Sequence, residues 1–158
     1  MFIKEVVDKI EGSEAFKKFQ KEHPEFYLVH LFYLEPDESW QVGYYSKTSD
    51  KIVVFSGDPV TVSEEDDPFK KHGAVHALDL PAVKIDFDKA MELVEEARQK
   101  EHSAELVNKK IVILQYIEQV VWNITLISAQ FNLINVRVDA VTGDVLRVKK
   151  ESIMSLGK

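Results

Sequence analysis

Runs of aromatic and β-branched residues, separated by short polar stretches, are the feature that most limits how this chain can fold. These runs lie at 26–34, 40–47, 51–63, 110–118, 120–128, 133–140 and 144–152. Their composition is typical of β-strands. Most of the intervening stretches are too short for the crossover connections that parallel strands need. The sequence therefore predicts antiparallel sheet in both halves of the chain.

Residues with helical spacing precede each group of predicted strands. Apolar residues recur at steps of three and four over 2–10, which predicts a short helix, and Ser13 is a suitable N-cap for a second helical segment. The stretch 86–100 has the strongest helical pattern, with one apolar stripe and an aspartate near its start. We also expect a short helical piece at 103–109.

The two halves of the chain resemble each other in sequence. Residues 28–35 align with 111–118 at a shift of 83, and Trp40 aligns with Trp122 at a shift of 82. The only two tryptophans thus begin equivalent strands. We therefore predict an α+β fold, built as a tandem repeat of a helix followed by a small antiparallel β-sheet. Helices would cover two such sheets or one merged sheet.

The stretch that joins the halves has the composition of a linker. Residues 63–81 contain an acidic run, two prolines and a glycine, and they have no clear period. The sequence predicts a first helix-plus-sheet unit at 1–63, a linker at 64–81 and a second unit at 82–158. One merged globular domain is the alternative.

The end of the chain resembles a known family. Residues 122–126, 135–140 and 142–146 are similar to the closing strands of a PepSY-like domain, whose last hairpin reads roughly valine-x-valine-aspartate-alanine-x-threonine-glycine-x-valine. The match covers 120–148 and, with the preceding helix, 82–150. The resemblance implies a helix followed by a small antiparallel sheet, with cystatin-like packing. It also implies a protein-binding or inhibitory role without catalytic residues. The first half resembles the family only through the internal repeat.

Composition and charge exclude several classes of site. The chain has no cysteine, so disulfides, thiolate metal sites and cysteine nucleophiles are excluded. Its net charge is −7 and its pI is about 5.3, which argue against nucleic acid and anionic membrane surfaces as partners. No apolar run approaches the roughly 18 residues of a membrane span. The charged N-terminal segment is unlike a signal peptide, so we expect a cytoplasmic protein; an exported protein trimmed of its leader or anchor is the alternative.

The sharpest motif, "VDAVTGDV" at 138–145, could be either a small ion site or a turn. Gly143 suits a positive φ angle, while Asp139 and Thr142 can accept hydrogen bonds from nearby backbone amides. A calcium loop would need more oxygen ligands than Asp139 and Asp144 supply. A phosphate cradle would need more glycines and a following helix. We interpret the motif as a structural turn.

Histidines offer the weak candidates for a metal site. His72 and His76 are four residues apart, downstream of an acidic run, and this spacing would place both imidazoles on one face of a helix. A solvated linker is the simpler interpretation of these residues, because Gly73 does not favour a helix there. His30 lies in an apolar strand, where a core or interface position is expected.

Large aromatic residues crowd into the first predicted sheet. Trp40, Tyr44, Tyr45 and Trp122 are candidates for a partner interface. Strand alternation sends about half of such residues inward, so a core built of large side chains is the favoured interpretation.

No catalytic motif is present: the sequence lacks a nucleophile elbow, a P-loop and a dinucleotide-binding fingerprint. The sequence therefore predicts a non-enzymatic module without a cofactor, which binds a protein or peptide partner or assembles with itself. Pairing at a free sheet edge is the expected mode. The alternative is a small-molecule or metal-binding protein, with a minor hydrolase included. It would use a pocket between the repeats and His30, His72 and His76.

Overall fold

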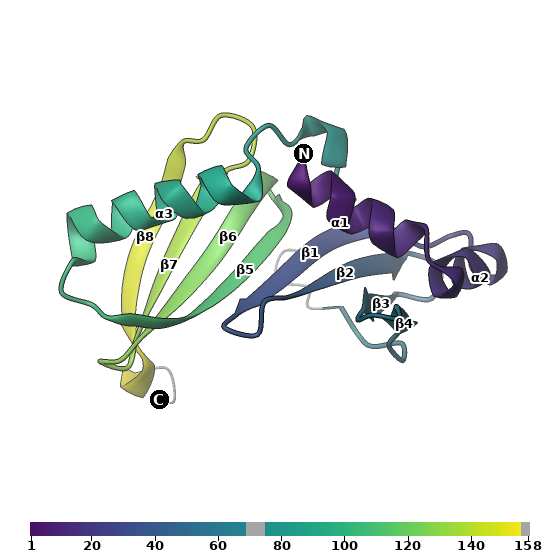
Figure 1. Cartoon of the computed structure of the whole chain (residues 1–158), viewed down its shortest axis with the longest axis horizontal. Coiled ribbons are helices and arrows are strands. Elements are labelled where there is room, and N and C mark those ends of the chain that lie inside the picture. The colour runs from purple at the N-terminus through teal and green to yellow at the C-terminus, as the bar shows by residue number, and fades with distance from the viewer. Residues whose placement is uncertain (69–74, 156–158) are drawn as a thin grey trace.

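A computed structural model describes residues 1–68 and 75–155. Its eight strands form one antiparallel sheet in the order β4-β3-β2-β1-β5-β6-β7-β8, and three α-helices lie along one face (Figure 1). The strands are β1 Tyr27–Glu35, β2 Ser39–Ser46, β3 Lys51–Ser56, β4 Thr61–Val62, β5 Val107–Ile117, β6 Gln119–Ser128, β7 Asn132–Asp139 and β8 Val145–Ser152. The helices are α1 Phe2–Glu11, α2 Glu14–Glu22 and α3 Phe87–His102, with short 3-10 turns at Leu80–Ala82 and Ile153–Ser155. The predicted α+β class and antiparallel order are confirmed; the tandem repeat stays a prediction.

Capping residues set where the helices begin. The hydroxyl of Ser13 accepts a hydrogen bond from the backbone N–H of Phe16 at 3.2 Å, as its N-cap position predicts. The carboxylate of Asp86 caps α3 through the N–H of Phe87 at 2.9 Å. The same carboxylate also accepts hydrogen bonds from the N–H groups of Phe2 and Ile3, at 2.6 and 3.2 Å. One acidic side chain therefore holds the N-termini of both α1 and α3.

The prediction of a short helical piece at 103–109 is wrong. Helix α3 ends at His102, and residues 107–109 already belong to β5. Val107 and Lys109 pair with Ser128 and Ile127 of β6, so these backbone groups find partners in the sheet instead of in a further helical turn.

The two halves of the chain meet where β1 pairs with β5. The pairing runs antiparallel over six residue pairs, from His30 opposite Gln115 to Glu35 opposite Lys110. A cluster of aromatic rings covers this seam on the helix side. Trp40 contacts Phe2, Tyr33 and Phe87 at ring-centroid distances of 5.7, 4.9 and 5.2 Å. The seam and the cluster tie the halves into one sheet.

The sheet has a helix-covered face and an opposite face. Leu31, Val112, Trp122 and Val136 point toward the helices and are fully buried. Alternate residues point the other way, because successive strand residues face opposite sides. Apolar residues form the middle of that opposite face, where Phe32 lies across from Ile113 and Leu34 across from Ile111; all four are half-buried.

The described parts of the predicted linker follow the sheet closely. Asp66 forms a bridge with Ile52 beside β3. Farther along, the N–H of Leu78 donates to the backbone oxygen of Leu28 at 2.9 Å, and the hydroxyl of Tyr27 donates to that of Val75 at 2.9 Å. Leu78 is buried in the core, so this end of the linker packs as part of the fold.

Candidate functional site

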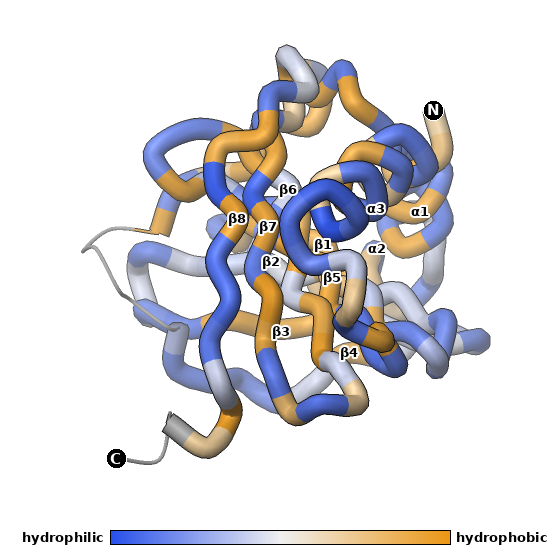
Figure 2. Tube along the Cα trace, turned by 90° about the vertical axis from the view of Figure 1, so that its left-hand side faces the viewer, coloured by the Kyte–Doolittle hydropathy of each residue, from blue (hydrophilic) through white to orange (hydrophobic). Residues whose placement is uncertain are grey.

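The two edges of the sheet are unequal. Strand β4, at one edge, has only two residues, whereas β8, at the other, has eight. Within residues 1–68 and 75–155, no strand pairs with the outer side of β8. Figure 2 looks onto this edge and shows β8 beside β7. A long unpaired edge strand presents backbone N–H and C=O groups to which another strand can add.

A groove separates β8 from the C-terminal half of α3. It encloses about 470 Å³. Its apolar lining comes from both elements, namely Leu93, Ala97, Val145, Leu146 and Val148, and the remaining lining residues are Glu96, Lys100, Glu101 and Arg147. Val145 and Leu146 are 42% and 47% exposed, a large fraction for apolar side chains in a strand. The groove can therefore accept apolar side chains from a chain lying along β8.

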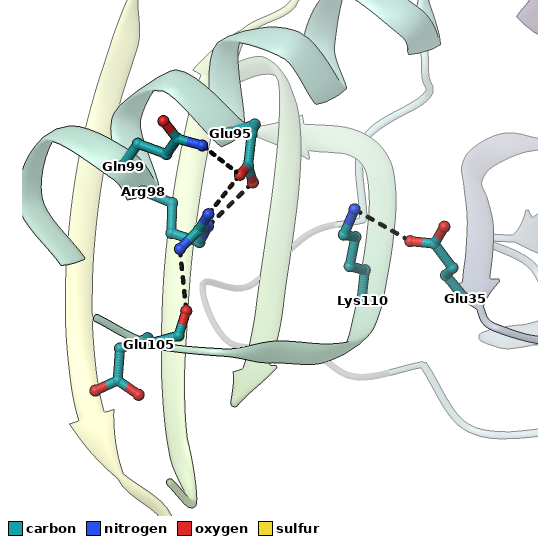
Figure 3. Close-up of polar contacts among 6 residues, drawn as sticks. All are labelled: Glu35, Glu95, Arg98, Gln99, Glu105 and Lys110. Carbon is teal, nitrogen blue, oxygen red and sulfur yellow. Dashed lines mark hydrogen bonds and ion pairs between the residues drawn. The ribbon is translucent and has the colours of Figure 1, made fainter. Parts of the chain in front are cut away.

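Polar contacts fix the helical wall of this groove (Figure 3). The guanidinium of Arg98 donates to both carboxylate oxygens of Glu95, with an Nε–Oε2 distance of 3.0 Å, and to the backbone oxygen of Glu105 at 3.0 Å. The Arg98 hydrogen bonds hold the pKa of Glu95 below its ordinary value. Gln99 adds a hydrogen bond to the same carboxylate at 3.2 Å. These contacts join the last turns of α3 to the segment that leads into β5.

Glu105 continues this network to the sheet. It is buried, and its Oε1 accepts a hydrogen bond from the side-chain amide of Asn132 at 2.7 Å. Lys150 of β8 approaches the same oxygen at 3.5 Å. Hydrogen bonding by Ser128 and Asn132 and the charge of Lys150 lower the pKa of the Glu105 carboxyl. Glu105 thus anchors the C-terminal part of β8 beside α3 and stays ionised at neutral pH.

The predicted turn motif forms the corner between β7 and β8, directly before the groove residue Val145. The Asp139 carboxylate accepts hydrogen bonds from the N–H groups of Val141 and Thr142, at 2.7 and 3.1 Å, and the Thr142 hydroxyl accepts one from Asp144 at 3.2 Å. Gly143 has a φ of +86°. These contacts within the corner between β7 and β8 occupy Asp139 and Thr142, and the backbone hydrogen bonds lower the pKa of Asp139 against the effect of burial.

Two arginines lie side by side on the face of the sheet away from the helices. Arg137 of β7 is directly opposite Arg147 of β8. Neither guanidinium has a hydrogen bond or ion pair to any described residue, and the Nε of Arg137 is buried without a partner. Burial and the charge of Arg147 lower the pKa of Arg137, while the charge of Glu118 acts in the opposite direction. Like charges directly across a sheet destabilise it. An anion placed beside the two arginines would therefore reduce their repulsion.

The structure does not bring the candidate histidines together. The ring of His76 lies against that of Tyr116, with a centroid distance of 4.7 Å and an angle of 48° between the ring planes, and His72 lies outside the described residues. The His30 ring lies over Gly43 on the face away from the helices. The acidic run, residues 64–67, lines a second groove of about 810 Å³ beside β3, and Lys51 forms an ion pair with Asp67 there at 2.6 Å. Across the described part of the chain, no three His, Asp or Glu side chains converge as metal ligands.

The candidate interface aromatics belong to the interior. Trp122 is fully buried, and its indole N–H donates to the backbone oxygen of Ile85 at 2.7 Å. Tyr44 and Tyr45 are also buried, and Trp40 is half-buried within the aromatic cluster. These four side chains therefore do not form an exposed surface. The hydrophobic effect favours the inward positions of such large rings.

Comparison with known proteins supports the fold alone. No family model matches the sequence, and no curated protein matches it. The structure is similar to the crystal structure of a candidate lipoprotein from Clostridium difficile 630, with a TM-score of 0.52 and 19% sequence identity. The similarity covers 87% of this chain and 91% of that protein. In the described part of this chain, no helix is long and apolar enough to cross a membrane.

Sequence reasoning predicted edge pairing in general but missed which edge would be free and the groove beside it. Arg147, Leu146 and Val148 were assigned only to a strand. The alternation of apolar and cationic residues over 145–150 was a usable signal, because an exposed edge strand often carries lysine and arginine.

Proposed function

We propose that this chain is a non-enzymatic module that binds an extended segment of a protein partner along β8. The observation that carries the proposal is the outer side of β8 over residues 145–150, which pairs with no strand among the described residues and lies beside an apolar groove. Backbone groups of β8 would pair with the added strand, and the groove between α3 and β8 would receive alternate side chains. This mode needs no catalytic group and no cofactor.

The shape of the β8 site supports a peptide over a compact small molecule. Both acidic and basic side chains line the groove, Glu96, Glu101 and Lys100 among them. An extended peptide gains main-chain hydrogen bonds at the edge and apolar burial in the groove at the same time. A small molecule would use only the groove.

The resemblance of residues 82–150 to PepSY-like domains is consistent with this function, because the family is associated with protein binding or inhibition. We further propose that the chain contains two such units, the first made of α1, α2 and β1 to β4 and the second of α3 and β5 to β8. In each half the helices precede four strands, and this order supports the proposal. Only the second unit keeps a full-length last strand.

Two matched substitutions test the proposed site. Leu146 at the β8 edge and Val62 at the β4 edge are similarly exposed, at 47% and 40%. Peptides selected from a random displayed library would be titrated against the isotope-labelled protein, and amide shifts would be mapped by NMR. We expect the shifts to follow β8 and α3, with Leu146→Lys weakening binding about tenfold and Val62→Lys leaving it unchanged. Shifts that map elsewhere, or equal effects of both substitutions, would rule out the β8 site.

Cellular location is a separate proposal. The sequence favours the cytoplasm, whereas the similar structure is that of a candidate lipoprotein, a name that supports export. Fractionation of the native source with an antibody against this chain distinguishes the two.

A further inference from the structure

We infer that the partner strand of β8 carries an acidic–apolar–acidic pattern. In this pattern acidic residues face Arg147 and Lys149, and the apolar residue between them enters the groove at Val148. This inference rests on the proposed function and specifies the chemistry of its partner.

The acidic positions follow from the face on which the β8 cations lie. Arg147 pairs across the sheet with Arg137, and Lys149 pairs with Asn135. Both therefore lie on the face away from the helices, since Val136 and Val138 of β7 are buried on the helix side. A strand added beyond β8 would place alternate residues directly beside these two cations. Opposite charges in such cross-strand positions stabilise a sheet.

Of Arg147 and Lys149, Arg147 would gain more from a carboxylate on the added strand. Lys149 already forms an ion pair with Glu151 at 2.7 Å, whereas the Arg147 guanidinium has no such partner among the described residues and lies across from Arg137. The same row of the sheet continues with Asn123 of β6, a neutral side chain. A carboxylate from the added strand would thus relieve repulsion between two guanidinium groups.

The apolar position follows from the alternation of β8. Val148 lies opposite Val136, on the helix side, and lines the groove together with Leu93 and Ala97. The next residue on that side, Lys150, is held by Glu105 at 3.5 Å. An apolar side chain is therefore favoured only over the part of the groove beside Val148 and Leu146.

A second copy of this chain is disfavoured as the partner strand at this register. Two β8 strands paired about a two-fold axis at Val148 would bring Arg147 of each copy opposite Lys149 of the other. Like charges at two such positions oppose the pairing. Cationic residues on an edge strand protect it from association with identical strands.

Three synthetic peptides test the pattern directly. Each is nine residues long, capped at both ends, and alternates valine with glutamate, serine or lysine. Amide shifts of the labelled protein would give the binding site and the dissociation constant for each. We expect the glutamate peptide to bind along β8 at least about tenfold more tightly than the serine peptide, and the lysine peptide to bind most weakly.

Charge reversal provides the matched control. In the R137E/R147E variant the preference should switch from the glutamate peptide to the lysine peptide. The K17E/K18E variant, on the exposed face of α2, changes the net charge equally and should keep the original preference. Circular dichroism would verify that both variants are folded. If the R137E/R147E variant fails to fold, the single R147E variant should still reduce the preference.

The outcomes separate this inference from the proposed function. Equal binding of all three peptides along β8 would overturn the acidic pattern and retain edge binding. Absence of binding along β8 by any peptide would overturn both. A wild-type dimer in light scattering that is lost in R147E would instead identify a second copy as the occupant and overturn the inference.

Discussion

The ring of His30 in β1 packs over Gly43 in β2, where no larger residue would leave room for it. A Cβ atom on residue 43 would lie 2.2 Å from the Cε1 atom of the His30 ring, so a glycine is required where the ring packs. The ring is sequestered there, and burial lowers the pKa of His30 from 6.5 to about 4. The imidazole is therefore neutral in the folded protein at physiological pH.

This pKa shift predicts that the protein loses stability on mild acidification. The unfolded chain binds a proton at His30 near pH 6.5, whereas the folded chain binds it only near pH 4. The free energy of unfolding should therefore decrease as the pH falls through this window, by at most about 3 kcal/mol. Urea unfolding between pH 7.5 and 4.5 measures the effect. In His30→Asn the decrease should be smaller by this amount; parallel profiles for the two proteins would contradict the assignment.

Gly143 makes a second residue-scale prediction. Its φ of +86° is unfavourable for other residues, and a Cβ atom would lie 3.3 Å from the Cδ1 atom of Ile85. We expect Gly143→Val to lower the free energy of unfolding by about 1–3 kcal/mol. Gly143→Asn should cost less, because asparagine tolerates positive φ. Thermal unfolding followed by circular dichroism compares the two; equal losses would show that the backbone angle is not the cause.

At the scale of elements, Asp86 links two helices that are far apart in the sequence. Its carboxylate receives N–H groups from the first turn of α1 and from α3, where the helix dipoles favour a negative charge. Asp86→Asn keeps the shape of the side chain but removes this charge, and we expect a loss of about 1–2 kcal/mol in chemical denaturation. Asp88→Asn, exposed in the first turn of α3, is the control and should cost less than half as much.

Local patterns predicted individual elements well, because each depends on residues close in sequence. The periodicity over 86–100 predicted α3 to within two residues at its C-terminal end, and Ser13 predicted the start of α2. The expected helical piece at 103–109 failed, since pairing with β6 decided the conformation of residues 107–109. Neither the pairing of β1 with β5 nor the unpaired side of β8 is encoded in a local pattern. Both depend on how distant segments meet, and so does the candidate site.

On the scale of the whole molecule, the seam predicts that the two halves unfold together. Phe87 of α3 contacts Trp40 at 5.2 Å and Trp122 at 6.1 Å, so one ring connects the two tryptophans across the β1–β5 pairing. In Trp40→Phe, the fluorescence of Trp122 reports on the second half. We expect its urea transition to coincide with the transition of the whole chain measured by circular dichroism. In Trp122→Phe, Trp40 should behave likewise; separate midpoints would show that the halves are independent.

The proposed binding along β8, together with the unequal edges, implies a stoichiometry. Strand β4 has only two residues, too few to hold an added strand, whereas no strand of the described residues pairs with the outer side of β8 over residues 145–150. A chain with one long unpaired edge can bind one added strand. After that, no second long edge is left for further strand addition, unless the added strand itself provides one. Under the proposed binding along β8, complexes would accordingly be closed and of fixed composition, with one partner segment bound to each chain. A protein with two receptive edges would be at risk of forming fibres.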